Sequence, residues 1–224
     1  MIKIAVDGPA GAGKSSLARA VAERLGYIYV DTGALYRTIG LYMDEHDIDP
    51  HDAEAVARAL PDISVEMIHQ GGEQTVLLNG RNVGDDIRTP KISTYASAVS
   101  AIPAVRAFLL NLQREIGDRQ NVVMDGRDIG TVIFPDADVK LFLTASPECR
   151  AKRRVLELCA RGRQVTYEEV LKDMQERDAN DRTRAIAPAV AAPDAIVLDN
   201  TNLNERETVD AAVAIIEGKL LSRQ

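Results

Sequence analysis

The sequence predicts an α/β fold in which helices cover a parallel β-sheet. Short apolar runs, each long enough for one buried strand, alternate along the chain with segments of helical periodicity. The five runs are residues 2–6, 27–30, 122–124, 139–143 and 196–198. The chain has 224 residues, of which 46% are hydrophobic and 27% are charged. We therefore expect one globular unit that buries a substantial core.

The helices between these runs have recognisable ends. After the first run, apolar residues share one face of a helix that should stop at Gly26, a residue suited to the left-handed position after a helix. Ser146, followed by Pro and Glu, is typical of a helix start. Thr166 with Glu169 matches a capping box, and Asn204 can cap the last helix.

One stretch departs from this alternation. Residues 63–67 alternate with period two, Gly71-Gly72 can form a turn, and residues 75–78 can form a second strand. Asn79-Gly80 favours a type I′ hairpin. These features predict a small antiparallel insert, and the segment 103–116 predicts a helix after it.

Composition limits the classes of function. The net charge of −7 disfavours a polymeric nucleic-acid partner, because such binding depends on a Lys/Arg surface. The first residues do not resemble a signal peptide, and no apolar segment is long enough to span a bilayer. Cys149 and Cys159 fit neither a redox pair nor a zinc knuckle, which favours reduced thiols in a cytoplasmic protein. His46, His51 and His69 match no metal pattern, so we expect them to be solvated.

A glycine-rich segment lies between the first predicted strand and the first predicted helix. It satisfies the phosphate-loop pattern of Gly, four residues, Gly-Lys-Ser/Thr. Backbone N–H groups can face the phosphates, Lys14 can reach the β and γ oxygens, and Ser15 or Ser16 can support magnesium. A chance glycine-rich turn would have to match the lysine, the hydroxyl and both flanking elements. The predicted ATP-binding residues here are Gly8, Pro9, Ala10, Gly11, Ala12, Gly13, Lys14, Ser15 and Ser16.

A cluster of charges follows the third predicted strand. Asp125 ends this strand, where an acid can organise magnesium near the phosphate loop. Many strands end in Asp at an ordinary turn, so Asp125 alone is weak evidence. Arg127 and Asp128 strengthen it, because they lie at the carboxyl end of a strand, where open α/β sheets form their ligand crevice.

Two further segments each allow a structural and a functional interpretation. Thr32 can cap the helix after the second strand, and Arg37 follows about one and a half turns later. A helix cap at Thr32 and a solvated side chain at Arg37 explain these residues as well as a binding role does. Arg177, Asp181 and Arg184 share one helical face. A surface ladder of ion pairs is the alternative there, and it remains the explanation for Asp178 and Arg182.

Together these residues resemble the bacterial cytidylate kinase family, in its long form with an enlarged nucleotide-binding insert. The resemblance covers almost the whole chain through residues 7–14, 31–37, 87–89, 125–131, 134–137, 177–184 and 187–188. It implies a three-layer phosphate-loop NTPase fold with five parallel strands in the order 2-3-1-4-5. It also implies one nucleoside monophosphate kinase domain over residues 1–224, with a core of 1–60 and 104–224, an insert at about 61–103 and a short lid at about 150–168.

The resemblance also implies residue roles. The base would contact Thr32, Arg106, Asp128 and Arg184; the sugar would contact Ser97, Arg177 and Asp181. The acceptor phosphate would contact Arg37 and Arg127, and the lid over ATP would contain Arg153 and Arg154. The catalytic set would be Lys14, Arg127, Asp128 and Arg177, and the magnesium set Ser15, Ser16 and Asp125, directly or through water. Thr32 departs from the serine more usual in this family.

The implied activity is transfer of the γ-phosphate of ATP, with Mg²⁺, to the phosphate of CMP or dCMP. Cytosine offers an amine donor beside two acceptors, so an Asp and an Arg complement it, whereas uracil would set a carbonyl against the acid. Another kinase of this fold, acting on UMP, AMP or shikimate, is the nearest alternative. A nucleotide-dependent switch is another, although the sequence lacks the guanine motif Asn-Lys-x-Asp. We expect a cytoplasmic monomer with no membrane partner.

Overall fold

The computed structural model describes residues 1–70, 73–160, 162–183 and 185–222. The chain forms two compact units, and each is described by itself. The first unit comprises Ile28–Val122 together with Met1, and the second comprises Ile2–Tyr27 and Val123–Gln224.

The five predicted strands are confirmed. They are β1 (Lys3–Asp7), β2 (Ile28–Asp31), β6 (Val122–Asp125), β7 (Val139–Thr144) and β8 (Ile196–Asp199). Their order in the sheet is β2-β6-β1-β7-β8, which is the predicted 2-3-1-4-5 when these strands alone are numbered along the chain. β1 pairs in parallel with β7, and β7 with β8. All residues of β6 are buried, as expected for a strand inside a parallel sheet.

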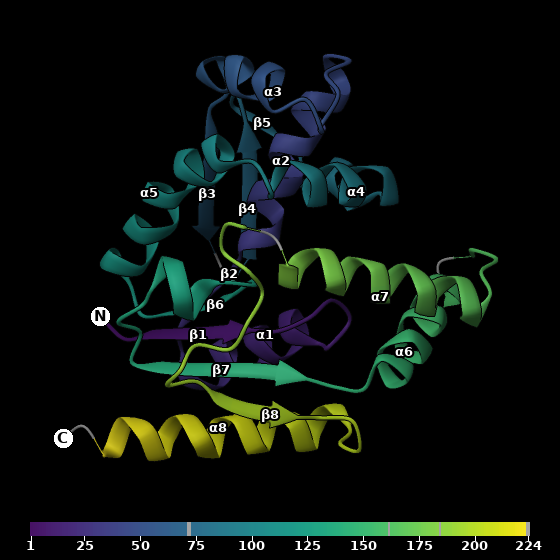
Figure 1. The fold of residues 1–224 in the computed structure, drawn as a ribbon. Helices are drawn as coiled ribbons and strands as arrows, with labels where there is room; N and C mark the ends of the chain where they lie inside the picture. Colours follow the sequence, from purple (N-terminus) through teal and green to yellow (C-terminus); the bar gives the residue numbers. More distant parts are fainter. Residues whose placement is uncertain (71–72, 161, 184, 223–224) are drawn as a thin grey trace. The chain divides into compact units, whose positions relative to one another are not determined.

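The second unit contains most of the helices whose ends the sequence predicts. They are α1 (Lys14–Leu25), α6 (Pro147–Ala160), α7 (Tyr167–Thr183) and α8 (Glu205–Leu221). Gly26 ends α1 in the left-handed conformation, with φ 69°. Thr166 and Glu169 form the predicted capping box, and Asn204 forms another at the start of α8. Helix α8 contacts α1 and β7, and α6 and α7 form a helical hairpin (Figure 1).

The first unit combines helices with a second sheet. Its helices are α2 (Thr32–Glu45), α3 (Ala53–Ala59), α4 (Pro90–Val99) and α5 (Pro103–Arg119), with 3₁₀ turns at Leu60–Asp62 and Asp86–Arg88. The antiparallel sheet contains β3 (Val65–Gln70), β4 (Glu73–Leu78) and β5 (Arg81–Asn82), which confirms the small antiparallel insert. Asn79 and Gly80 have positive φ, as a type I′ turn requires. The predicted turn at Gly71-Gly72 lies outside the described residues.

Among the described residues, no single helix has the length and apolar character needed to cross a membrane. Within the same part of the chain, one pair of helices, α4 and α5, passes that test when taken together, and the two are bent by 99° to each other.

Candidate active site

The phosphate loop approaches its neighbours so closely that two of its glycines cannot be replaced without a shift. Gly8 has φ +147°, and a Cβ there would lie 2.0 Å from the carbonyl oxygen of Leu143 in β7. Gly11 has φ +71°, and a Cβ there would lie 2.6 Å from Cε of Met174 in α7. The loop is therefore packed between the sheet and α7, which fixes the direction of its backbone.

Lys14 begins α1 and is almost fully buried, with 5% exposure. Its Nζ donates a hydrogen bond to the carbonyl oxygen of Pro9 at 2.8 Å. The pKa of Lys14 is lowered to about 7, first by burial and next by the positive charge of Arg127, whereas Asp125 and Asp7 oppose the shift. The nearby carboxylates thus compensate the charge of the buried ammonium only in part. An anion bound at this loop would supply the remaining negative charge.

Ser15 and Asp125 lie at the same place. The Ser15 hydroxyl donates to Oδ2 of Asp125 at 2.8 Å, and Asp125 is buried. A hydroxyl and a carboxylate are oxygen donors of the kind that Mg²⁺ takes, usually alongside substrate phosphates and water. These residues therefore fit a magnesium ion that arrives with a triphosphate. Ser16 is exposed in the same first turn of α1, and the part of the chain that the structure describes holds no cluster of three metal-binding side chains.

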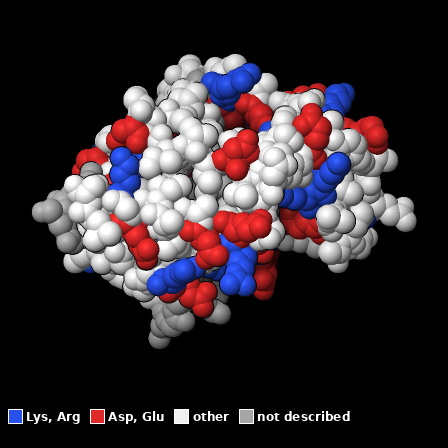
Figure 2. All heavy atoms as spheres, turned by 90° about the horizontal axis from the view of Figure 1, so that it is seen from below, with Lys and Arg blue, Asp and Glu red and all other residues white. Residues whose placement is uncertain are grey.

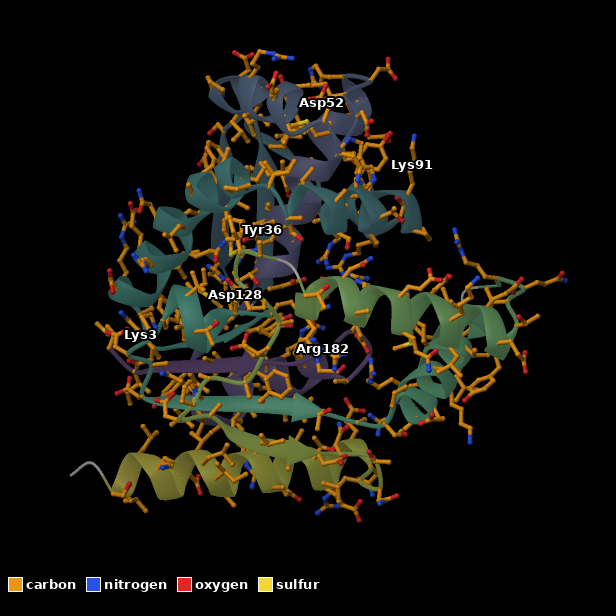
Figure 3. The ribbon with its side chains drawn as sticks, viewed as in Figure 1. Lys3, Tyr36, Asp52, Lys91, Asp128 and Arg182 are labelled. Atoms are coloured by element: carbon orange, nitrogen blue, oxygen red, sulfur yellow. The ribbon has the colours of Figure 1, made fainter. Side chains whose placement is uncertain are left out.

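The end of β6 brings together residues that are far apart in the sequence. Nε of Arg127 donates to Oδ2 of Asp181 in α7 at 3.1 Å. Asp128, labelled in Figure 3, is buried and begins the short π-helical turn η3 (Ile129–Ile133), whose Val132 N–H donates to the Asp128 carbonyl. The structure thus joins a predicted phosphate-binding residue to a predicted sugar-binding residue.

Helix α7 places Arg177 one turn before Asp181, as the sequence predicts. Arg184 lies outside the described residues. The surface-ladder interpretation is wrong for Asp178, because its carboxylate pairs at 2.6 Å with Arg150, which is buried in α6. Arg182 is exposed, in agreement with that interpretation.

Arg150 is a residue that sequence reasoning missed. Besides Asp178, it donates to the carbonyl oxygens of Ala145 at 3.0 Å and of Ala10 in the phosphate loop at 2.9 Å. It therefore ties the loop to both α6 and α7. The sequence gives only a weak indication of this role, an arginine among several at the start of a helix.

Asn200, just after β8, was also missed. Its Nδ2 donates to the carbonyl oxygen of Ala12 in the phosphate loop at 3.1 Å, and it accepts from Arg153 through Oδ1 at 3.1 Å. Arg153 thus contacts a residue that supports the loop, whereas Arg154 pairs with Glu157 on its own helix at 2.7 Å. A polar residue at the end of a strand, the same feature that drew attention to Asp125, could have indicated Asn200.

In the first unit, Asp31 and Arg37 form an ion pair of 2.6 Å. The predicted cap at Thr32 is wrong by one residue, because Asp31 caps α2 by accepting the Ala34 N–H, while Thr32 is buried in the first turn. A Cβ on Gly33 would lie 2.9 Å from Nη1 of Arg37, so the guanidinium lies directly against the backbone of this turn.

The antiparallel sheet of the first unit contacts the end of β2. Nε2 of His69 lies 3.1 Å from the Tyr29 carbonyl oxygen, and Oε1 of Gln74 accepts the Asp31 N–H at 2.8 Å. His69 is therefore half-buried and hydrogen-bonded rather than solvated, and burial lowers its pKa. His46 and His51 are exposed, as expected.

Two other predicted substrate residues lie on neighbouring helices of the first unit. Arg106 in α5 is buried, donates to the Ser100 carbonyl at 3.1 Å and lies 5.6 Å from the ring centre of Tyr36. Ser97 is half-buried in α4, and its carbonyl accepts the Ser100 hydroxyl. Both predicted residues therefore contact Ser100.

The strand order, the glycine-rich loop and the buried Lys14 define a phosphate-loop nucleotide-binding protein. The family model for cytidylate kinase matches residues 4–218, and the chain belongs to that family. It is accordingly a kinase, a phosphotransferase that uses ATP.

Named relatives agree with this assignment, and one solved structure has a similar fold. The chain is 46% identical to a cytidylate kinase of Fervidobacterium nodosum over 215 residues, covering 96% of both chains. It is 47% identical to a cytidylate kinase of Carboxydothermus hydrogenoformans over 218 residues, covering 97% of this chain and 98% of the other. An uncharacterised protein of Eubacterium ventriosum has a similar fold, with a TM-score of 0.55 at 12% identity and coverage of 97% and 99%.

Proposed function

We propose that this protein transfers the γ-phosphate of ATP to CMP or dCMP, which gives ADP and CDP or dCDP. The observation that carries the proposal is the buried Lys14 in a phosphate loop, in a chain that belongs to the cytidylate kinase family. An ATP phosphate would satisfy the buried ammonium better than the Pro9 carbonyl that now accepts its hydrogen bond.

The donor side of the reaction is assigned to the second unit. The backbone N–H groups of residues 8–13, the Lys14 ammonium and the start of α1 bind the ATP phosphates. Ser15, Ser16 and Asp125 hold magnesium, directly or through water. When bound, Mg²⁺ neutralises charge on the β- and γ-phosphate oxygens. We assign Arg153 and Arg154 to a lid over ATP at about residues 150–168.

The acceptor side of the reaction is assigned from the family resemblance. Arg37 and Arg127 bind the CMP phosphate, and Ser97, Arg177 and Asp181 bind its sugar. The hydrogen bond from Arg127 to Asp181 supports this assignment, because one contact then orients the groups for phosphate and sugar together. Thr32, Arg106, Asp128 and Arg184 bind the base, where the Asp128 carboxylate accepts from the cytosine amine.

The chemistry requires alignment and charge neutralisation and no covalent intermediate. An oxygen of the CMP phosphate attacks the γ-phosphorus of ATP in line, the bond from that phosphorus to the bridging oxygen breaks, and ADP leaves. Lys14, Arg127 and Arg177 face the negative charge of the transferring group, while Asp128 fixes the base. A base without the cytosine amine leaves Asp128 unpaired, which disfavours UMP.

We further propose a cytoplasmic monomer whose ligands are small nucleotides rather than polymeric nucleic acid or a membrane. The net charge of −7 supports this proposal. On the face drawn in Figure 2, Lys and Arg side chains are interspersed with Asp and Glu. Such a mixture of signs gives a nucleic-acid backbone little continuous attraction.

The test is ADP release from ATP and Mg²⁺, with CMP, dCMP, UMP, AMP and dTMP supplied separately. Fast turnover confined mainly to CMP and dCMP is expected. Activity on another acceptor would keep the kinase and overturn the assigned base contacts. No turnover with any of the five would overturn the proposed reaction.

A further inference from the structure

Asp7, the last residue of β1, makes a contact that the proposed mechanism does not use. It is 3% exposed. Oδ1 accepts the N–H of Ile129 at 2.8 Å, and Oδ2 accepts the N–H of Gly130 at 2.7 Å. These residues directly follow Asp128, the proposed base-binding residue. Both carboxylate oxygens of Asp7 therefore accept hydrogen bonds from the backbone next to Asp128.

The same turn is enclosed on another side by Lys140. A Cβ on Gly130 would lie 3.1 Å from Cδ of Lys140 and 3.3 Å from Oδ2 of Asp7. Lys140 is itself held in place by hydrogen bonds to the Pro135 carbonyl at 2.6 Å and to Asp194 at 2.9 Å. The backbone after Asp128 therefore has little room to move sideways.

A neutral side chain of the same shape would not reproduce the Asp7 contact. The pKa of Asp7 is raised to about 6, because burial outweighs the N–H bonds from Gly130 and Ile129, which lower it. Those two bonds therefore offset part of the cost of the buried charge. An asparagine would place an NH₂ group against one of the two backbone donors. One hydrogen bond would be lost and two donors would face each other.

We propose that Asp7 is a positioning residue for the acceptor base: by holding the N–H groups of Ile129 and Gly130, it fixes the direction in which Asp128 presents its carboxylate to cytosine. The inference rests on the proposed function, because it assumes that Asp128 binds the base. It adds a residue from the phosphate-loop strand to the part of the site that selects the acceptor.

The test is Asp7→Asn, with KM measured separately for CMP and for ATP and with turnover on UMP as a measure of selectivity. Loss of one charge-assisted hydrogen bond should raise KM for CMP about tenfold and lower the preference for CMP over UMP. KM for ATP should rise by less than KM for CMP, because Lys14 and the loop backbone are kept and Asp7 is only one of the two carboxylates that favour the charged form of Lys14. A purely structural role would raise both KM values together.

Asp138→Asn is a matched control, since the Asp138 carboxylate accepts the N–H of Lys3 at the opposite end of β1 at 2.8 Å. It should leave both KM values unchanged. Gly130→Ala is the second test, because its Cβ would displace the same turn, and it should give a smaller rise in KM for CMP alone. If Asp7→Asn does not fold, the KM values of Gly130→Ala test the positioning role instead.

The outcomes separate the two hypotheses. If the wild-type protein does not phosphorylate CMP, the proposed function fails. If the wild-type protein is active but Asp7→Asn alters neither KM, or alters both equally, the positioning role is overturned. The same holds if Asp138→Asn reproduces the selective rise in KM for CMP.

Discussion

Strands β1 and β2 both end in an aspartate that precedes a proposed nucleotide-binding residue, but the two acids are used differently. Asp31 is about one-fifth exposed and contacts its own helix, through the Ala34 N–H and the Arg37 guanidinium. Asp7 is buried, and both of its oxygens accept backbone N–H groups more than 120 residues away. One acid organises a local turn, and the other links two distant segments.

The difference shows which parts of a binding site local sequence can specify. The Asp31 contacts span three and six residues, so they form wherever the helix forms. The Asp7 contacts can form only when β6 has joined the sheet beside β1 and the turn η3 has folded after it. We therefore expect a substitution at the end of β2 to affect a single contact with the ligand. The effect of a substitution at the end of β1 should depend on contacts that exist only in the assembled fold.

The largest effect should come from the cations that follow the two strands. Lys14→Met should lower kcat at least about a hundredfold, because a preorganised charge at the transferring phosphate is lost. Arg37→Met should instead raise KM for CMP about tenfold, with a smaller change in kcat, since it removes an acceptor contact. Steady-state kinetics with the concentrations of both nucleotides varied would measure kcat and the KM for CMP of each variant.

Far-UV circular dichroism should show that both variants remain folded. Burial already lowers the pKa of Lys14, so a methionine of similar length removes a costly charge without leaving a cavity. A wild-type kcat in Lys14→Met would remove the phosphate loop from the mechanism.

The same distinction separates what the sequence predicted from what it could not. Apolar runs predicted all five strands of the parallel sheet, and Thr166 and Asn204 predicted helix starts, because these features depend on neighbouring residues. The phosphate loop was predictable because its residue types are dictated by the geometry of a bound phosphate. The strand order came from family resemblance.

The missed contacts all join segments that the sequence leaves far apart. Arg150 reaches both Ala10 and Asp178, and Asn200 reaches Ala12. None of these pairs has a periodicity or a spacing that local sequence could reveal. Asp178 was misassigned for this reason, since a surface ion pair on its own helix and a partly buried pair with another helix produce the same local pattern.

A smaller effect should follow from breaking the local contact alone. Asp31→Asn keeps a good N-cap but loses the charge that pairs with Arg37, so KM for CMP should rise about threefold while the free energy of unfolding changes by less than about 0.5 kcal/mol. Kinetics and urea unfolding would measure the two quantities.

Asp52→Asn is the control for that change, because Asp52 caps α3 through the N–H groups of Glu54 and Ala55 without a paired arginine in the cap. It should leave KM for CMP unaltered. Equal effects of the two substitutions would show that the helix cap, rather than the pairing with Arg37, matters for binding.

A different kind of effect, on the pH dependence of stability rather than on KM, is expected at Asp7. Burial raises the pKa of Asp7 from its ordinary 3.8 to about 6, so the folded protein holds this proton more tightly than the unfolded chain does. Its contribution to stability is complete below pH 3.8 and is lost as the pH rises through about 6.

Asp7→Asn has no such titration. The free energy of unfolding of the wild-type protein minus that of the variant should therefore fall by about 1 kcal/mol between about pH 5 and about pH 7.5.

Urea unfolding of both proteins across that range would measure the difference, and it should level off once Asp7 is fully ionised. A difference that stays constant would mean that the N–H bonds of Ile129 and Gly130 already hold Asp7 ionised at pH 5. The two N–H bonds would then offset the cost of burying the Asp7 charge, so burial alone would not decide whether this carboxylate is ionised.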